Sequence, residues 1–234
     1  AGLQSNVRLA PYAGAVGRGF LGAWETDMPQ NVGLQAFDDD APATTFVRVP
    51  AAPSGGRNNG PAVAASGDRA MTVWRALDGG GRPLGVRAAS TPLARRLAAP
   101  TMTRTVADGD VSSVAVRVNA NAAEVQDQPA VAALGSGEVV VAWRDAARDA
   151  SDNDGTSIRW ARLDAGLGRV GNVGVANSTT AGSQSTPAVV VSGGASPAVL
   201  IAWRDEATGL VRARLRTVED GDVVARIGRG AGDF

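Results

Sequence analysis

The 234-residue sequence contains no Cys, no His and no Lys, so all 23 of its basic residues are Arg. These absences exclude disulfide bonds, thiol nucleophiles, imidazole bases and metal sites built from His or Cys. The 23 basic residues are balanced by 23 acidic ones, and no basic tract stands out, which argues against a nucleic-acid or membrane-surface partner. No apolar run approaches the roughly 20 residues of a membrane-spanning helix, so no membrane insertion is expected.

Turn-forming residues are abundant, with 30 Gly and 12 Pro, and Asp far outnumbers Glu. These residue types supply the dihedral angles and local hydrogen bonds of tight turns. A chain of this length is long enough for a sizeable core, and all-β chains of this size commonly fold as one domain. The composition therefore indicates a single all-β domain over residues 1–234.

Two stretches of the chain repeat one another. Residues 126–160 read QDQPAVAALGSGEVVVAWRDAARDASDNDGTSIRW, and residues 184–214 read QSTPAVVVSGGASPAVLIAWRDEATGLVRAR. Each has Gln three residues before Pro-Ala-Val, then a Gly/Ser turn and an apolar run that ends in Ala-Trp-Arg-Asp. Weaker copies occupy the first half of the chain, which gives repeat units at about 5–50, 60–119, 128–177 and 186–228. The Trp residues that end the four runs lie 50, 69 and 60 residues apart: Trp24, Trp74, Trp143 and Trp203.

The pattern of apolar residues in the predicted strands favours a β-propeller. Residues 139–143 are apolar at consecutive positions, which is typical of a strand covered on both faces, whereas other segments alternate as half-buried strands do. Sheets packed face to face around an axis contain strands of both kinds, some covered on both faces and some half-buried. Propeller repeats run roughly 40 to 50 residues in rings of about four to eight blades. We therefore predict four blades of four antiparallel strands, with the four Trp at equivalent, buried positions.

The third and fourth copies resemble the Q-x-x-P-A-V … V-V-A-W … I-x-x-R-x-x-D-x-x-G repeats of large secreted bacterial β-propeller proteins. Residues 151–158, SDNDGTSI, also resemble the Asp-box of sialidase-like propellers, S-x-D-x-G-x-T-W, although Asn153 and Ile158 depart from it. In that family the motif is a structural hairpin between the third and fourth strands of a blade. The resemblance thus implies that residues 139–143 form a third strand and residues 158–163 a fourth, and that residues 170–176 begin the next blade.

The same register predicts how the ring closes. It makes residues 6–9 a second strand without a first strand, and residues 223–227 a first strand without a blade. We therefore expect residues 223–227 to cross to the N-terminal blade, pair with residues 6–9 and close a four-bladed ring.

The acidic loop has two interpretations. Asp149, Ser151, Asn153 and Asp154 could offer oxygen ligands to Ca²⁺, but no ligand register is established. The favoured alternative is a tight hairpin held by its own side-chain to backbone hydrogen bonds. No other cofactor is expected.

Two further groups are candidates for ligand contact. Arg144-Asp145 and Arg204-Asp205 follow Trp at equivalent strand ends, where indole, guanidinium and carboxylate could form sugar sites. The favoured alternative is that each Trp fills the space between blades and the charges pair locally. Residues 84–99 break the repeat and are predicted to be an insertion, in which Arg95 and Arg96 could contact a partner; tolerated drift explains the insertion equally well.

The chain begins Ala-Gly-Leu, as a protein does after removal of a secretory signal, so we expect an extracellular or periplasmic location. With the usual catalytic residue types missing, the leading hypothesis is a secreted, non-catalytic binding or assembly module, recognising a protein partner or surface glycan, as a subunit of a larger assembly or alone. The alternatives are a lectin that uses the Trp-Arg-Asp strand ends, and a glycoside hydrolase with two carboxylates about 5 to 10 Å apart.

Overall fold

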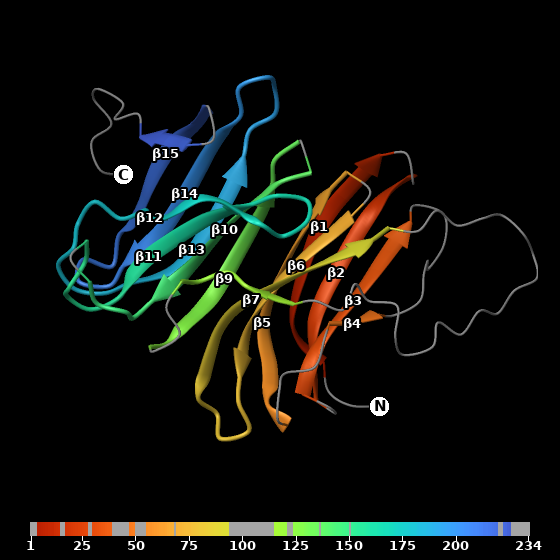
Figure 1. Cartoon of the computed structure of the whole chain (residues 1–234), viewed down its shortest axis with the longest axis horizontal. Coiled ribbons are helices and arrows are strands. Elements are labelled where there is room, and N and C mark those ends of the chain that lie inside the picture. The colour runs from red at the N-terminus through yellow and green to blue at the C-terminus, as the bar shows by residue number, and fades with distance from the viewer. Residues whose placement is uncertain are drawn as a thin grey trace, which may run out of the picture.

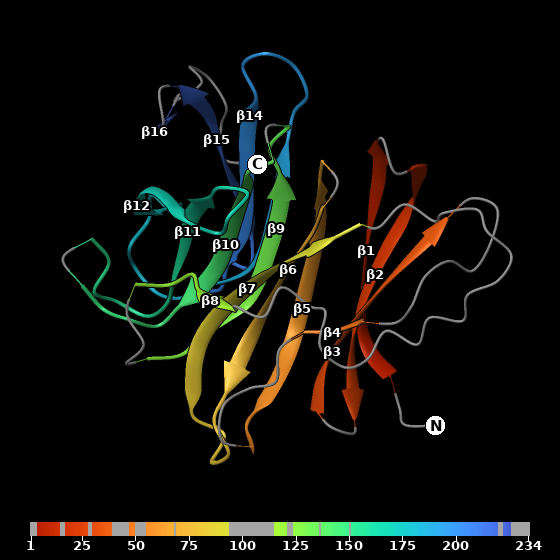
Figure 2. The same cartoon turned by 45° about the vertical axis from the view of Figure 1, so that its right-hand side comes forward.

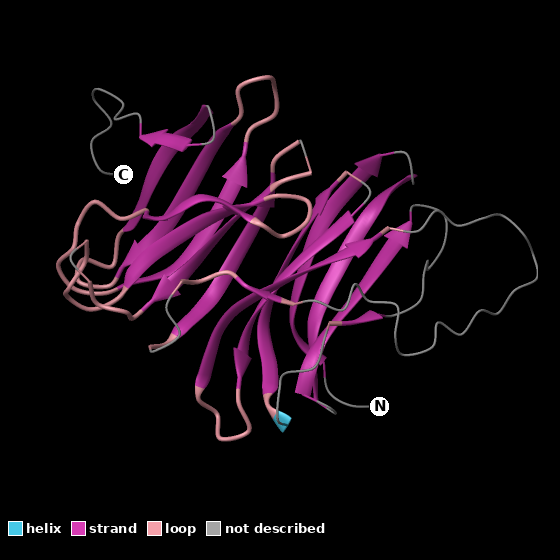
Figure 3. Ribbon diagram, viewed as in Figure 1, coloured by secondary structure: helices cyan, strands magenta, loops and turns pink. Residues whose placement is uncertain are grey.

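The computed structural model describes residues 4–14, 17–27, 30–38, 47–49, 55–67, 69–93, 115–120, 124–135, 137–149, 151–219 and 222–225. Strands and loops make up these residues, apart from a single 3₁₀ residue at Gly55 (Figure 3). The prediction of an all-β chain is confirmed.

The strands form four antiparallel sheets of four strands each, and in every sheet consecutive strands are neighbours. Sheet 1 holds β1 (Gln4–Gly14), β2 (Gly17–Asp27), β3 (Gln30–Asp38) and β4 (Val47–Arg48). Sheet 2 holds β5 (Arg57–Ser66), β6 (Arg69–Leu77), β7 (Pro83–Pro92) and β8 (Val116–Arg117). Sheet 3 holds β9 (Gln126–Ala133), β10 (Val139–Asp145), β11 (Ser157–Leu163) and β12 (Arg169–Val175). Sheet 4 holds β13 (Gln184–Val191), β14 (Ala198–Asp205), β15 (Val211–Glu219) and β16 (Asp222–Ala225).

The four sheets follow one another in chain order, from sheet 1 in red to sheet 4 in blue (Figures 1 and 2). The first strands of the sheets lie next to each other: β5 packs on β1, β9 on β5 and β13 on β9. Among the described residues, sheets 1 and 4 form no comparable packing contact. Over the described residues the sheets therefore make an open row, with sheets 1 and 4 at its two ends.

The predicted ring closure is wrong. β16 pairs with β15 of its own sheet, with Val223 opposite Val218, and among the described strands β1 pairs with β2 alone. The strand register that led to the prediction is also wrong by one strand. Residues 139–143 lie in a second strand, residues 158–163 in a third, and residues 170–175 in the fourth strand of the same sheet. The acidic loop joins second and third strands here, so the position implied by the Asp-box resemblance does not apply.

Residues 84–92 are not an insertion. They belong to β7, the third strand of sheet 2, which pairs with β6 along its whole length. The prediction was based on the long spacing of this repeat, but Val86, Ala88 and Ala89 pack inside the core like other third-strand residues. The remainder of the predicted insertion, residues 94–99, lies outside the described residues.

The hydrophobic core consists of layers between successive sheets, and the second strands contribute most to it. Trp24, Trp74, Trp143 and Trp203 lie at equivalent positions near the ends of β2, β6, β10 and β14, and all four are buried. The prediction of equivalent, buried Trp positions is confirmed. Residues 139–143 are fully buried because the two faces of β10 belong to different layers: Val141 packs toward sheet 2 and Val140 toward sheet 4.

Candidate functional site

The same backbone distortion recurs at the start of every first strand. β1, β5, β9 and β13 each contain a bulge, and the residue inside it has a left-handed conformation: Asn6 (φ 52°), Gly60 (φ 58°), Gln128 (φ 51°) and Thr186 (φ 48°). Such a φ is costly for residues other than Gly, above all for β-branched Thr. Bulges are over-represented beside active sites, where they redirect side chains. Four equivalent bulges on adjacent first strands therefore indicate a candidate site at the edge of the four sheets where the first strands begin.

Beside each bulge, the first strand and the end of the second strand place a pair of residues opposite each other. These four pairs define the polar rim: Ser5–Glu25, Asn59–Arg75, Asp127–Arg144 and Ser185–Arg204. The second member of each pair directly follows one of the four Trp. The second strands thus contribute one carboxylate and three guanidinium groups to the rim, at the edge of the sheets where the first strands begin.

Hydrogen bonds and an ion pair connect the rim from sheet to sheet. The Gly60 N–H donates to Glu25 Oε1 at 2.6 Å, which joins sheets 1 and 2. Arg75 reaches Asp127 across the boundary between sheets 2 and 3, with 3.9 Å between Nη1 and Oδ2. The Thr186 N–H donates to Gln128 Oε1 at 2.7 Å and joins sheets 3 and 4.

Arg144 forms a bidentate ion pair within the rim. Its Nε and Nη2 donate to the two oxygens of Asp127 at 2.7 and 2.6 Å. The Asp127 hydrogen bond raises the pKa of Arg144 above its ordinary value; burial opposes this effect, and the negative charges of Asp127 and Glu206 add to it. Glu206 also accepts a hydrogen bond from the Ser185 hydroxyl and lies 3.5 Å from Arg204. Two carboxylates from adjacent sheets therefore act on one guanidinium.

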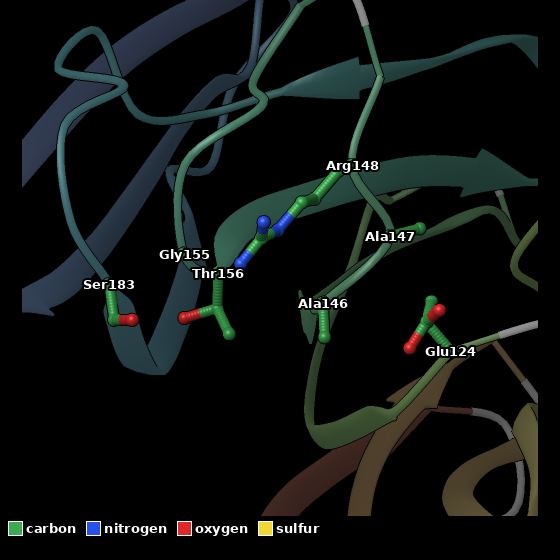
Figure 4. Close-up of a pocket in the computed structure, with 7 residues that line it drawn as sticks. All are labelled: Glu124, Ala146, Ala147, Arg148, Gly155, Thr156 and Ser183. Atoms are coloured by element: carbon green, nitrogen blue, oxygen red, sulfur yellow. The ribbon is translucent and has the colours of Figure 1, made fainter.

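A hollow of about 670 Å³ opens between the loops of sheets 3 and 4 at the edge that carries the rim. It is lined by Glu124, Ala146, Ala147, Arg148, Gly155, Thr156 and Ser183. Figure 4 shows Arg148 reaching toward Gly155 and Thr156, with Glu124 on the opposite side beyond Ala146. Because Glu124 lies two residues before β9 and Ser183 directly before β13, the hollow adjoins the polar rim.

The sequence-predicted strand-end residues have two different fates. Arg144 and Arg204 lie on the rim, and the Arg204 side chain is more than half exposed. Asp145 and Asp205 instead point into the sheets and are almost completely buried. Asp145 accepts hydrogen bonds from Trp143 Nε1 at 3.1 Å and the Ala147 N–H at 2.7 Å, so it holds the strand end together.

Asp205 is also a structural residue. The backbone N–H of Thr208 and the Arg212 guanidinium hold the pKa of Asp205 below its ordinary value, and the Ala207 N–H donates to the same carboxylate at 3.1 Å. Both Asp residues, and the buried indoles beside them, are therefore inaccessible to a sugar. The predicted Trp-Arg-Asp sugar site is corrected to its Arg members alone. Arg95 and Arg96 lie outside the described residues.

The acidic loop is a hairpin held by its own bonds, as the sequence favoured. Asp149 and Asp152 exchange backbone hydrogen bonds, and Asp149 Oδ1 accepts the Ser151 N–H at 2.8 Å. The Ser151 hydroxyl, followed by the Ser151 N–H and Arg159, lowers the pKa of Asp149 to about 2. Asp154 accepts the Gly182 N–H at 3.0 Å, and Asn153 is exposed. In the described part of the chain, no cluster of three or more acidic residues is arranged to hold a metal ion.

Sequence reasoning missed Asp127, Gln128, Thr186 and Glu206. The repeated Q-x-x-P pattern was the available signal, because the positions between Gln and Pro carry the bulge in sheets 3 and 4. The pattern reveals where a repeat begins, but not that its backbone becomes left-handed there.

Solved structures show what this arrangement is similar to. An α-L-arabinanase of Penicillium chrysogenum, solved with arabinobiose, superimposes with a TM-score of 0.53 and 10% identity over 92% of this chain and 63% of its own. A thermostable family-43 glycoside hydrolase gives 0.52 and 8% over 98% of this chain and 74% of its own. The fucose-recognising, six-bladed β-propeller lectin of Aleuria aurantia gives 0.51 and 11% over 97% and 64%. The fold is of the β-propeller type.

The chain spans less than two thirds of the arabinanase and of the lectin. No protein-family model and no curated protein sequence matches it. The described residues include no helix with the length and hydrophobicity needed to cross a bilayer. The hypothesis of a non-catalytic binding or assembly module is corrected: two of the three similar structures named above, the arabinanase and the family-43 glycoside hydrolase, are enzymes.

Proposed function

We propose that the protein recognises carbohydrate at the polar rim. The observation that carries this proposal is that four sheets present carboxylate, guanidinium and amide groups along one common edge, beside the bulges of the first strands. Sugar hydroxyls both donate and accept hydrogen bonds, and charge-assisted hydrogen bonds are roughly twice as strong as neutral ones. A hydroxyl can reach Arg204, an exposed member of the rim, and Glu206 beside it without breaking the Asp127–Arg144 pair.

The rim is suited to a neutral, polar ligand. Its charges of both signs alternate, so it offers no uniform field for a polyanion such as nucleic acid. The indoles nearby are buried, so recognition relies on hydrogen bonds and not on stacking against Trp. The adjoining hollow adds Glu124, Arg148 and the Thr156 and Ser183 hydroxyls along the path of a longer glycan. An extracellular or periplasmic location is part of the same proposal.

A glycan array followed by calorimetric titration tests the proposal. The panel includes arabinobiose and fucose, the sugars of two similar structures. Arg204→Ala and Glu206→Ala should each weaken binding about 10- to 100-fold, since a hydrogen bond to a charged group contributes about 1.5–3 kcal/mol. Arg169→Ala is the matched control, because Arg169 is exposed and lies at the opposite end of sheet 3. Absence of any hit at millimolar sugar, or equal loss in the control, would refute glycan recognition at the rim.

Cleavage of a glycosidic bond is a second candidate function. It is favoured by the two carboxylates, Asp127 and Glu206, that flank Arg144 from adjacent sheets. Glycoside hydrolases commonly use two carboxyl groups in different environments, one to donate a proton and one to remain ionised. Here Asp127 is mostly buried and bidentate to Arg144, whereas Glu206 is partly exposed and bonded to a hydroxyl. These two carboxylates are the candidates for the two catalytic roles, and Glu206 is the one that a substrate can reach.

Hydrolysis is tested with 4-nitrophenyl glycosides, beginning with α-L-arabinofuranoside. Glu206→Gln and Asp127→Asn should each lower kcat about 100-fold or more, the usual loss when a general acid or base is removed. Arg169→Ala should keep full activity, and far-UV circular dichroism should show that all variants are folded. A wild-type chain without turnover on any of the glycosides, or variants with unchanged kcat, would contradict the catalytic assignment but leave glycan binding in place.

A further inference from the structure

Exposed large apolar side chains are confined to the two ends of the row. Among the described residues they number nine, and all belong to sheet 1 or to sheet 4 and its turn: Val7, Leu9, Phe20, Phe37, Val190, Leu200, Leu210, Val211 and Leu215. Sheets 2 and 3 expose none, because each is covered on both faces. Large exposed apolar patches generally mark interaction sites.

The interior of the row follows one packing rule. The face of a sheet that carries the second-strand Trp packs on the preceding sheet: Trp143 lies with Met71 and Val73 of sheet 2, and Trp203 with Val140 of sheet 3. The opposite face receives the following sheet. Every boundary between sheets therefore joins a Trp face to a receiving face.

The free face of sheet 4 is a receiving face. Leu200 holds the position in sheet 4 that Val140 holds in sheet 3, because Val140 pairs with Ala132 and Arg162, and Leu200 pairs with Val190 and Leu215. Val140 is 0% exposed under sheet 4, whereas Leu200 is 37% exposed.

A comparison of the third strands of sheets 3 and 4 gives the same result. Ile158 is 0% exposed, and Val211 at the corresponding position of sheet 4 is 64% exposed. The face that sheet 3 buries is thus repeated in sheet 4, where no described strand covers it.

The free face of sheet 1 is a Trp face. Leu21 and Ala23 of β2 point to sheet 2, so Trp24, Phe20 and Gly22 point away from it. A Cβ placed on Gly22 would lie 2.9 Å from the Phe37 ring and 3.5 Å from Trp24, so these aromatic rings gather over the glycine. Phe20 is 52% exposed.

We propose that the two free faces dock on each other between two copies of this chain, the Trp face of sheet 1 on the receiving face of sheet 4. A second copy carries the complement of both ends, so two identical head-to-tail interfaces form and close a ring of eight sheets. Closed rings satisfy every interface, and eight blades lie at the upper end of the range of about four to eight found in propellers.

Charge at the rim agrees with this docking. Arg204 corresponds in register to Arg75, which reaches Asp127 on the first strand of the next sheet. At the position of Asp127, sheet 1 has Ser5, whose hydroxyl donates to Glu25 at 3.2 Å. Docking therefore brings the exposed guanidinium of one copy toward the Ser5–Glu25 pair of the other.

The test is the mass of the chain in solution and its dependence on the two faces. Sedimentation velocity and light scattering should show a dimer that forms with increasing protein concentration. Phe20→Arg and Leu200→Arg each place a charge on one free face and should each raise the dimer dissociation constant at least 100-fold. Arg169→Ala, which lies on neither free face, should leave dimerisation unchanged.

Mixing the two variants distinguishes head-to-tail docking from contacts between like faces. A mixture of F20R and L200R retains one intact interface and should form a heterodimer, although neither variant associates alone. Contact between two sheet 4 faces would instead leave F20R fully dimeric, which would refute the proposal. A wild-type chain that remains monomeric at about 100 µM would refute it as well, with circular dichroism showing that the chain is folded.

Discussion

Replacement of Asp145 by Ala should be one of the most damaging single changes in sheet 3. The carboxylate accepts hydrogen bonds from Trp143 Nε1 and the Ala147 N–H, and a third from Gln126 Nε2 at 3.3 Å. Arg159 lies 3.6 Å away and is itself almost buried. Ala would leave these donors without an acceptor in a dry environment. Each orphaned donor costs about 1–3 kcal/mol, and breaking a buried charge pair costs about 3–5 kcal/mol.

Because Arg159 keeps a second partner, Asp149 at 2.7 Å, we expect a total loss of about 3–5 kcal/mol in the free energy of unfolding. Asp145→Asn keeps one acceptor oxygen and should lose roughly half as much. Urea unfolding followed by far-UV circular dichroism measures both variants. Glu124→Ala is the matched control, because this exposed carboxylate makes no hydrogen bond or ion pair with the described residues. A loss for Asp145→Ala no greater than that of Glu124→Ala would refute the structural role of the carboxylate.

Three further predictions concern stability. Trp74→Ala should cost about 3–5 kcal/mol in chemical unfolding, because Trp74 is enclosed between sheets 1 and 2. Thr186→Gly should stabilise the chain by about 0.5–1 kcal/mol in the same assay, since relief of the φ of 48° outweighs the added chain entropy. Asp149, with its pKa lowered to about 2, stabilises the fold above pH 4 and ceases to do so as the pH falls toward 2. Because its side chain is 48% exposed, screening reduces this contribution to about 1 kcal/mol, and an acid titration of Asp149→Asn against the wild type should show the two stabilities converging in that range.

The sequence was sufficient to predict the fold class and the equivalence of the repeats. Periodic apolar runs ending in Trp require covered strands, and the four Trp do lie at matching buried positions. The phase of the strands within a sheet was not accessible. A four-strand repeat looks the same whichever strand is counted first, so the phase depended on where the acidic loop was placed. That loop joins β10 to β11, one strand earlier than predicted. The same error of one strand led the prediction to assign residues 223–225 to the N-terminal sheet and not to sheet 4.

The candidate site was only partly predictable, because it is made of residues whose role depends on backbone conformation. Arg144 and Arg204 were found from their position after Trp. Asp127 and Thr186 were not, because each lies within or beside a bulge that no residue type announces. Gly60 has the conformation expected of Gly, but Gln128 and Thr186 adopt it against their own preference. Tertiary packing of the first strands therefore determines the geometry of the rim.

Equal motifs also have unequal chemistry in this chain. The sequence Ala-Trp-Arg-Asp occurs at 142–145 and at 202–205, and both Asp residues are buried. Asp145 binds the indole of its own Trp, whereas Asp205 binds Arg212 at 2.8 Å, and among the described residues the Trp203 indole N–H has no acceptor. The third strand places an Arg opposite the Trp in both sheets, Arg159 opposite Trp143 and Arg212 opposite Trp203. The difference lies in the acidic loop: Arg159 binds Asp149 at 2.7 Å and stays 3.6 Å from Asp145, whereas Arg212 contacts Asp205 at 2.8 Å. A repeat thus specifies where a side chain lies, and the neighbouring loop decides what it binds.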